Sequence, residues 1–233
     1  MDYLIYVVLP YVTIVTFMVG FAWRIRTWWA RPRAKAVLFP AARSGAVAVS
    51  RLVGDAVLFG KTFSVSKSLW LMAVLFHLGV LLVVLGHIRT VTEFGFLWSL
   101  LHLDGAGIES VAFGMGMTAG GLILAGVMLL LVRRLGPTMR VISIFQDYFV
   151  LSALLAIILS GIAMRLWMPV HVDEIQHYAR GVLTLQPAVE VRNTLFMYHF
   201  FLAQILIMYF PFSKLIHLVS KPVAESWTIE VGG

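Results

Sequence analysis

The chain contains 233 residues, of which 61% are hydrophobic and only 12% are charged, with a net charge of +7. A soluble globular domain has about 45–50% apolar and about 25% charged residues, so this composition indicates an integral membrane protein. The sequence contains no cysteine, which excludes disulfides, iron–sulfur clusters bound by this chain and covalently attached c-type haem.

Five apolar runs are long enough to cross a membrane as helices. A span needs about 20 residues, and helices are the expected form because lipid offers no partners for backbone polar groups. The first run has no cationic segment before it, so we interpret it as a retained span rather than a cleaved signal. The sequence therefore predicts an all-α integral membrane protein, a single domain over residues 1–233. Its spans cover about Tyr3–Trp23, Leu69–Ile88, Val111–Val132, Phe149–Met168 and Leu195–Leu218.

The lysines and arginines are distributed unevenly between the two sides of this predicted bundle. Fourteen of the eighteen fall after the first run, after the third run or at the C-terminal end, and four fall on the opposite side. Cytoplasmic connections carry the excess of Lys and Arg, so the N-terminus is predicted outside and the C-terminus in the cytoplasm. This sidedness accounts for most of the net charge, and no nucleic-acid partner is needed to explain it.

The connection between the first two runs is long, from Arg24 to about Ser68, and holds nine of the eighteen cations. Within it, "AVSRLVGDAVLFGKTFSVSKSLWL" mixes cations with apolar residues, which is typical of an amphipathic helix lying on a membrane surface. We predict such a helix at the cytoplasmic face, where the segment around Ala46–Lys61 is expected to help seat a partner subunit.

Four of the seven histidines lie in the second and fifth runs and match in depth. The second run contains "LFHLGVLLVVLGH", with His77 toward the cytoplasm and His87 near the outer surface. The fifth run crosses in the opposite direction, with His199 near its outer end and His217 at its inner end. The antiparallel runs would pair outer with outer and inner with inner, which is the arrangement that two haem b groups with histidine ligands on both faces require.

The spacings along the two runs differ. The histidines of the fifth run are eighteen residues apart and would share one face of a straight helix, whereas those of the second run are ten residues apart. These spacings correspond to about 27 Å and about 15 Å along a helix, and a break at Pro211 is expected to absorb part of the difference. Gly79 and Gly86, beside the histidines of the second run, leave room for a flat macrocycle.

Other interpretations of these residues remain open. A histidine in a span can hydrogen-bond a neighbouring helix, and glycines in spans often serve packing, although an ionisable residue in lipid is a functional candidate by default. A histidine-lined transition-metal transporter is the alternative function. Such sites usually recruit Asp, Glu, Cys or Met beside His, and the second and fifth runs contain no carboxylate. The remaining histidines, His102, His171 and His177, are predicted to be solvated loop residues.

"LFHLGVLLVVLGH", followed much later by "MYHFFLAQILIMYFPFSKLIHLVSKPV", resembles the gamma subunit of respiratory nitrate reductase, as does "RGVLTLQP" before the fifth run. That family is a five-span, dihaem cytochrome b that oxidises quinol. The resemblance implies that His87 and His199 hold the outer haem and that His77 and His217 hold the inner haem. It also implies a site for menaquinol or ubiquinol beside the outer haem, near Gly86.

The resemblance further implies that the chain is the quinol-oxidising, electron-transfer subunit of a respiratory complex in the cytoplasmic membrane. Electrons would leave the inner haem for a cytoplasmic iron–sulfur subunit, and terminal catalysis would belong to a catalytic partner. The long first connection and "YFPFSKLIH" look more like the cytochrome b subunits of sulfite-reductase-associated complexes and of heterodisulfide reductase. Protons would leave outward through carboxylates such as Glu93, Asp104, Glu109, Asp173 or Glu174.

One departure concerns the quinol site. Some nitrate reductase relatives place a lysine near the quinol, just before the third span, but no lysine occurs here between Lys67 and Lys214. The sequence therefore predicts the location of the quinol site without naming its cationic contact.

Overall fold

The computed structural model of the protein describes residues 2–30, 54, 58–187, 191, 193–217 and 219–220. The regular elements in these residues are all helices, and five of them are long and apolar enough to cross a membrane. The prediction of five spans is therefore confirmed. They cover Leu4–Trp29, Lys67–Ile88, Gly105–Leu135, Phe145–Trp167 and Thr194–Phe212.

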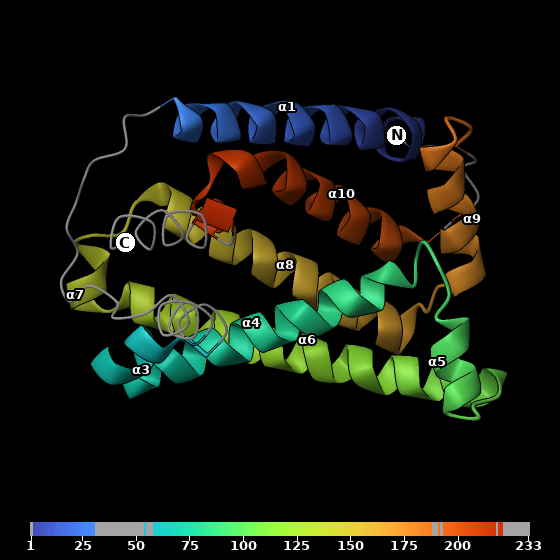
Figure 1. Ribbon diagram of the computed structural model, residues 1–233, viewed down its shortest axis with the longest axis horizontal. Helices are drawn as coiled ribbons and strands as arrows, with labels where there is room; N and C mark the ends of the chain where they lie inside the picture. The colour runs from blue at the N-terminus through green and yellow to red at the C-terminus, as the bar shows by residue number, and fades with distance from the viewer. Residues whose placement is uncertain are drawn as a thin grey trace, which may run out of the picture.

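The spans are joined by short helices that lie at the ends of the bundle. In Figure 1 the five long helices run roughly along the long axis of the molecule, and α9 lies across the end near the N-terminus. The described helices are α1 (Leu9–Trp29, after a π-helical turn over Leu4–Val8), α3 (Gly60–Val65), α4 (Lys67–Ile88), α5 (Gly95–Leu100), α6 (Gly105–Leu135), α7 (Pro137–Arg140), α8 (Phe145–Trp167), α9 (Val172–Leu183) and α10 (Thr194–Tyr209).

The third span is longer than the apolar run that predicts it. Helix α6 has 31 residues, about 46 Å at 1.5 Å per residue, and so exceeds the hydrocarbon layer. It begins where Oδ1 of Asp104 accepts a hydrogen bond of 2.8 Å from the backbone N–H of Gly107, a side-chain cap of the helix N-terminus. It ends before Pro137, which lacks the N–H needed to continue the helix.

Helices α4 and α6 approach each other through glycines. A Cβ atom on Gly79 would lie 2.8 Å from the backbone N of Ile123, and one on Gly126 would lie 2.8 Å from the backbone N of Phe76. Small residues let membrane helices pack backbone to backbone. Of the two roles considered for Gly79, helix packing and contact with a macrocycle, the structure therefore supports helix packing.

An aromatic cluster fixes α9 across the end of the bundle. The ring of Tyr6 stacks on Phe196 with centroids 6.2 Å apart and meets Tyr178 edge-on at 5.8 Å. The hydroxyl of Tyr178 donates a hydrogen bond of 2.7 Å to the carbonyl of Tyr6. Helix α9, in the connection between the fourth and fifth spans, therefore packs on the first and last spans.

The fifth span does not continue as one helix to His217. Helix α10 ends at Tyr209 and is followed by two 3-10 turns, Phe210–Phe212 and Lys214–Ile216, with extended backbone at Ser213 between them. The break that the sequence predicts at Pro211 is therefore present, and His199 and His217 do not lie on one straight helix. The proline ring in the first of these turns, at Pro211, prevents the regular hydrogen-bond ladder from continuing.

The described part of the first connection packs on the second span. Within it, Nε1 of Trp70 donates a hydrogen bond of 2.8 Å to the carbonyl of Leu58, and the rings of Phe63 and Trp70 lie 5.1 Å apart. Residues 31–53 and 55–57 of this connection, which include the first part of the predicted amphipathic helix, lie outside the described residues. The rest of the predicted helix forms α3 and the start of α4, with extended backbone at Ser66 between them. The orientation of the bundle in the membrane stays a prediction.

Candidate functional site

The structure brings the four histidines of the second and fifth spans together in two pairs. The ring centroids of His87 and His199 lie 6.3 Å apart, with an angle of 21° between the ring planes. The ring centroids of His77 and His217 lie 6.0 Å apart, with an angle of 84°. We call His77–His217 the first pair and His87–His199 the second pair. These are the two pairs that the sequence predicts from the depth of each histidine in its apolar run. The role of these histidines as haem ligands stays a prediction.

The separation within each pair fits a metal ion held between two imidazoles. Metal–nitrogen bonds of about 2 Å on opposite sides of one ion place the two ring centroids about 6 Å apart. The observed separations of 6.0 and 6.3 Å agree with this value. The donor set of two neutral imidazoles also suits the iron of haem b.

One ring nitrogen of each histidine, Nδ1, lies within hydrogen-bonding distance of a backbone carbonyl. A carbonyl accepts only, so Nδ1 must carry the proton and donate, which leaves the lone pair for a metal on Nε2. Nδ1 of His77 lies 2.8 Å from the carbonyl of Ala73, and Nδ1 of His87 lies 2.8 Å from that of Val83. Nδ1 of His199 lies 3.0 Å from the carbonyl of Ile157, and Nδ1 of His217 lies 2.7 Å from that of Lys214. All four imidazoles are thus fixed in the tautomer that binds a metal through Nε2.

Helix α8 contributes to the second pair, which the sequence does not predict. Besides the carbonyl of Ile157, Oγ of Ser160 lies 3.2 Å from Nδ1 of His199. A Cβ on Gly161 would lie 3.1 Å from Cε1 of the same ring. The adjacent small residues Ser160 and Gly161 in an otherwise apolar run were the available signal.

Gly86 differs from Gly79 in its surroundings. A Cβ atom on Gly86 would meet no protein atom within 4 Å, so this surface of α4, next to His87, is open. The proximity of Gly86 to a haem or quinol stays a prediction.

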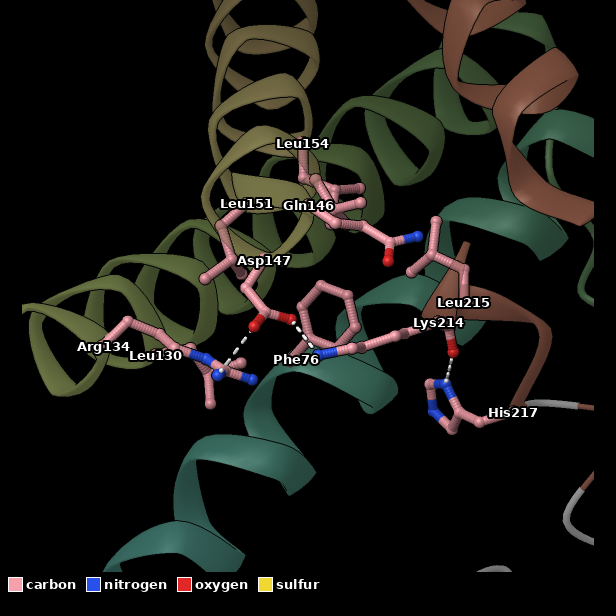
Figure 2. A pocket seen from close by; sticks show the side chains of 11 residues that line it. Phe76, Leu130, Arg134, Gln146, Asp147, Leu151, Leu154, Lys214, Leu215 and His217 are labelled. Atoms are coloured by element: carbon pink, nitrogen blue, oxygen red, sulfur yellow. Dashed lines mark hydrogen bonds and ion pairs between the residues drawn. The ribbon is translucent and has the colours of Figure 1, made fainter. Parts of the chain in front are cut away.

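A cavity of about 190 Å³ lies beside His217. Figure 2 shows its polar wall, where the carboxylate of Asp147 lies between the side chains of Arg134 and Lys214. Oδ2 of Asp147 is 3.1 Å from Arg134 Nη1, and Oδ1 is 2.7 Å from Lys214 Nζ. Only 4% of the Asp147 side chain is exposed, and the backbone N–H of Ile144 also donates to it.

The ion pairs of Asp147 connect it to a histidine of the first pair. Asp147 holds the side chain of Lys214, and the carbonyl of Lys214 accepts the hydrogen bond from His217 Nδ1. Sequence reasoning did not identify Asp147. A carboxylate at the start of an apolar run, in "FQDYF", was the available signal.

A second polar cluster lies just beyond His87. Arg89 forms ion pairs with Glu93 at 2.8 Å and with Glu109 at 2.7 Å, and Gln176 of α9 donates to the carbonyl of Arg89 and to Glu93. Burial opposes the ionisation of Glu93, but hydrogen bonds from Trp98 and Arg89 outweigh it and lower the pKa of this carboxyl. These residues line part of a cavity of about 450 Å³.

The structure separates the five carboxylates predicted to carry protons. Glu93 and Glu109 meet at Arg89, and Asp173 lines the same cavity, whereas Asp104 caps α6. No hydrogen bond or ion pair of the Glu174 side chain is found among the described residues. Of the remaining histidines, all exposed, His102 lies in a turn, His171 lines the cavity and His177 lies in α9 rather than in a loop.

Comparison with known proteins gives one family match and several relatives. The family described as "Nitrate reductase gamma subunit" matches residues 61–228. A "Hdr-like menaquinol oxidoreductase cytochrome b-like subunit" of Archaeoglobus fulgidus is 34% identical over 160 residues, 65% of this chain and 48% of the relative. The "Respiratory nitrate reductase 1 gamma chain" of Escherichia coli is 31% identical over 175 residues, 67% of this chain and 74% of the relative. The "Nitrate reductase gamma chain" of Bacillus subtilis is 26% identical over 161 residues, 64% of this chain and 71% of the relative.

The match to the Archaeoglobus relative spans about half of that protein's length. The family match covers α4, α10 and the turn before His217, and thus all four histidines, as well as most of the chain between and around them. Together with five helices that can cross a membrane, it identifies a multi-pass membrane protein, and this chain belongs to the nitrate reductase gamma subunit family.

Proposed function

We propose that this protein is a dihaem cytochrome b subunit that oxidises quinol and passes the electrons to a partner. The proposal rests on the two histidine pairs, in each of which the ring centroids lie about 6 Å apart. In each pair, Nδ1 of the histidines is hydrogen-bonded to a backbone carbonyl. The names of its relatives, a menaquinol oxidoreductase subunit and nitrate reductase gamma chains, support this role.

The four histidines would hold two haem b groups, one in each pair. The haem irons would supply one-electron redox chemistry between the two ends of the bundle. The protein's own part is to orient the imidazoles. On α4 the carbonyls one turn before His77 and His87 do so, while His199 depends on α8 and His217 on the turn at Lys214.

From the distribution of cations we propose that the pair His87–His199 lies at the outer side of the membrane. Oxidation of one quinol to quinone releases two electrons and two protons, and we propose that this occurs near Gly86. The electrons leave one at a time toward the inner pair. The protons leave at the outer end, where Glu93 and Glu109 lie beside Arg89. The lowered pKa of Glu93 keeps this carboxylate ionised, so it would release any proton it receives readily.

The electrons would leave the inner pair for a cytoplasmic iron–sulfur subunit that serves a separate catalytic subunit. This chain has no cysteine for a cluster, so terminal catalysis belongs to a partner. The identity to subunits of the Hdr-like type favours a sulfur-linked complex of the heterodisulfide reductase type over nitrate reductase. Menaquinol is the substrate we propose.

The transporter alternative would need further ligands around the histidines. Among the described residues, no group of three or more His, Cys, Asp and Glu side chains is placed to hold a metal ion. Pairs of imidazoles are what a macrocycle-bound iron requires, since the porphyrin supplies the other ligands.

The first prediction is the haem content of the purified protein. We expect about two b haems per chain in a pyridine haemochrome assay, both reducible by a menaquinol analogue, because each histidine pair provides the two axial ligands of one haem. A preparation without haem that binds zinc in the same membranes would contradict the proposal and support the transporter.

The second prediction concerns Gly86. Substitution Gly86→Leu should slow the reduction of the haems by a quinol analogue, because the new side chain would fill the open surface beside His87. Stopped-flow spectra measure this rate. Gly121→Ala, at another open position, on α6, is the control. Unchanged reduction in Gly86→Leu would place the quinol elsewhere.

A further inference from the structure

Arg165 is a charged residue inside a membrane span. It lies in the last turn of α8, within the segment Phe145–Trp167, on the helix that also supports His199. Ionisable side chains in spans are costly unless they are paired or serve a site. The sequence analysis uses Arg165 only as one of the four cations on the predicted outer side of the bundle.

The guanidinium of Arg165 lies against α6 at a glycine. A Cβ atom on Gly116 would collide with Cζ and would lie 2.6 Å from Nη1 of Arg165. The side chain is exposed, as is that of Arg180, but its guanidinium lies on the surface of α6 rather than pointing away from the bundle. An arginine that only reached along the helix surface toward the membrane–water boundary would not need a glycine on the neighbouring helix.

Most N–H donors of the Arg165 guanidinium have no hydrogen-bond acceptor among the described residues. Its side chain makes one hydrogen bond among the described residues, 3.3 Å from Nη1 to the carbonyl of Ala112, although a guanidinium has five N–H donors. No carboxylate of the described residues lies within 4 Å of it. The cations of the two polar clusters, Arg89, Arg134 and Lys214, all have carboxylate partners.

The position of Arg165 is electrostatically connected to the second histidine pair. Gly161, one turn before Arg165 on α8, packs on the ring of His199, since a Cβ atom there would lie 3.1 Å from Cε1 of that ring. The charge of Arg165 also interacts with His199 and with Glu109 and Arg89 of the cluster beyond His87, so these groups belong to the same end of the bundle. A negative group bound next to His199 would meet a cation that forms no ion pair within 4 Å with a carboxylate of the described residues.

We propose that Arg165 binds an anionic oxygen of a ligand beside His199. The inference rests on the proposed function, which provides two sources of such an oxygen at this end: a carboxylate of the outer haem, or the quinol oxygen that loses its proton during oxidation. A guanidinium binds either one through charge-assisted hydrogen bonds. It would take the place of the lysine that some relatives have near the quinol.

The experiment compares Arg165→Gln with Arg165→Lys in the full-length protein, after both haems have been counted. Potentiometric titration gives the midpoint potentials of the two haems, and a hydroxyquinoline N-oxide, a quinol analogue, gives the affinity of the quinol site. Arg180→Gln, which removes an exposed arginine of α9, is the matched control for loss of one charge at this end.

Each source predicts its own result. If the oxygen belongs to the haem, Arg165→Gln lowers the potential of the outer haem and not of the inner one, because a cation favours the reduced, less positive iron. If it belongs to the quinol, the potentials stay and the analogue binds about tenfold more weakly or worse, as expected for a lost charge-assisted hydrogen bond. In both cases Arg165→Lys should retain part of the wild-type value.

A second variant covers failure of Arg165→Gln to assemble. Gly116→Ala keeps the arginine but displaces the guanidinium from its place on α6, and should change the same quantity in the same direction, whereas Gly114→Ala, at an open position two residues away, should not. The proposal is overturned if Arg165→Gln and Gly116→Ala both leave potentials and analogue affinity unchanged, or if Arg165→Lys behaves like Arg165→Gln. Wild-type protein without haem would instead refute the proposed function.

Discussion

Substitution His199→Ala is expected to remove one b haem and to leave the other in place. His199 and His87 form one pair, with ring centroids 6.3 Å apart, and a haem that loses an axial imidazole loses both a bond and its orientation in the bundle. The pair His77–His217 uses carbonyls of α4 and of the turn at Lys214, which the substitution does not touch.

The measurement is the pyridine haemochrome content together with low-temperature spectra of the reduced protein. His87→Ala should give the same spectrum as His199→Ala, and His77→Ala the complementary one, since the partners of one pair bind the same iron. His102→Ala, outside both pairs, should keep two haems. Loss of different haems in His87→Ala and His199→Ala would contradict the pairing.

Substitution Asp147→Asn is expected to disturb the inner haem selectively. No regular helix holds His217, because α10 ends at Tyr209. Its imidazole depends on the carbonyl of Lys214, whose side chain is fixed by Asp147 at 2.7 Å. Without the carboxylate, Arg134 and Lys214 face each other across an uncharged amide, and the turn that carries His217 loses its anchor.

The energetic effect should be moderate for the fold and large for the site. Removing one partner of a buried ion pair costs about 3–5 kcal/mol, and the cost here should be lower because 58% of the Lys214 side chain is exposed. We expect Asp147→Asn to assemble, to keep the outer haem, and to bind the inner haem weakly or with a shifted spectrum and potential.

Two further variants separate anchoring from folding. Asp147→Glu keeps the negative charge and should restore part of the inner haem signal. Lys214→Ala keeps the backbone carbonyl for His217 but removes the contact with Asp147, so it should resemble Asp147→Asn. An unchanged inner haem in Asp147→Asn would show that the turn holds His217 without help from α8.

The sequence alone determined the five spans and the partners within each histidine pair. Apolar runs of about 20 residues identify spans because the thickness of the hydrocarbon layer sets their length, whatever their neighbours are. The pairing follows from topology, since consecutive spans alternate in direction and the depth of a residue can be counted from the end of its run. Thus the sequence by itself predicts that His87 pairs with His199.

Only the tertiary structure decided which surfaces of the helices meet. Helices that are apolar on all sides give no amphipathic signal, so Gly79 and Gly86 looked alike in the sequence, although one packs on α6 and the other is open. The anchoring of His217 by Asp147 and the seat of Arg165 on Gly116 join residues far apart in the chain. Such contacts depend on the rotation of each helix about its axis and on the break after α10, which packing between helices sets.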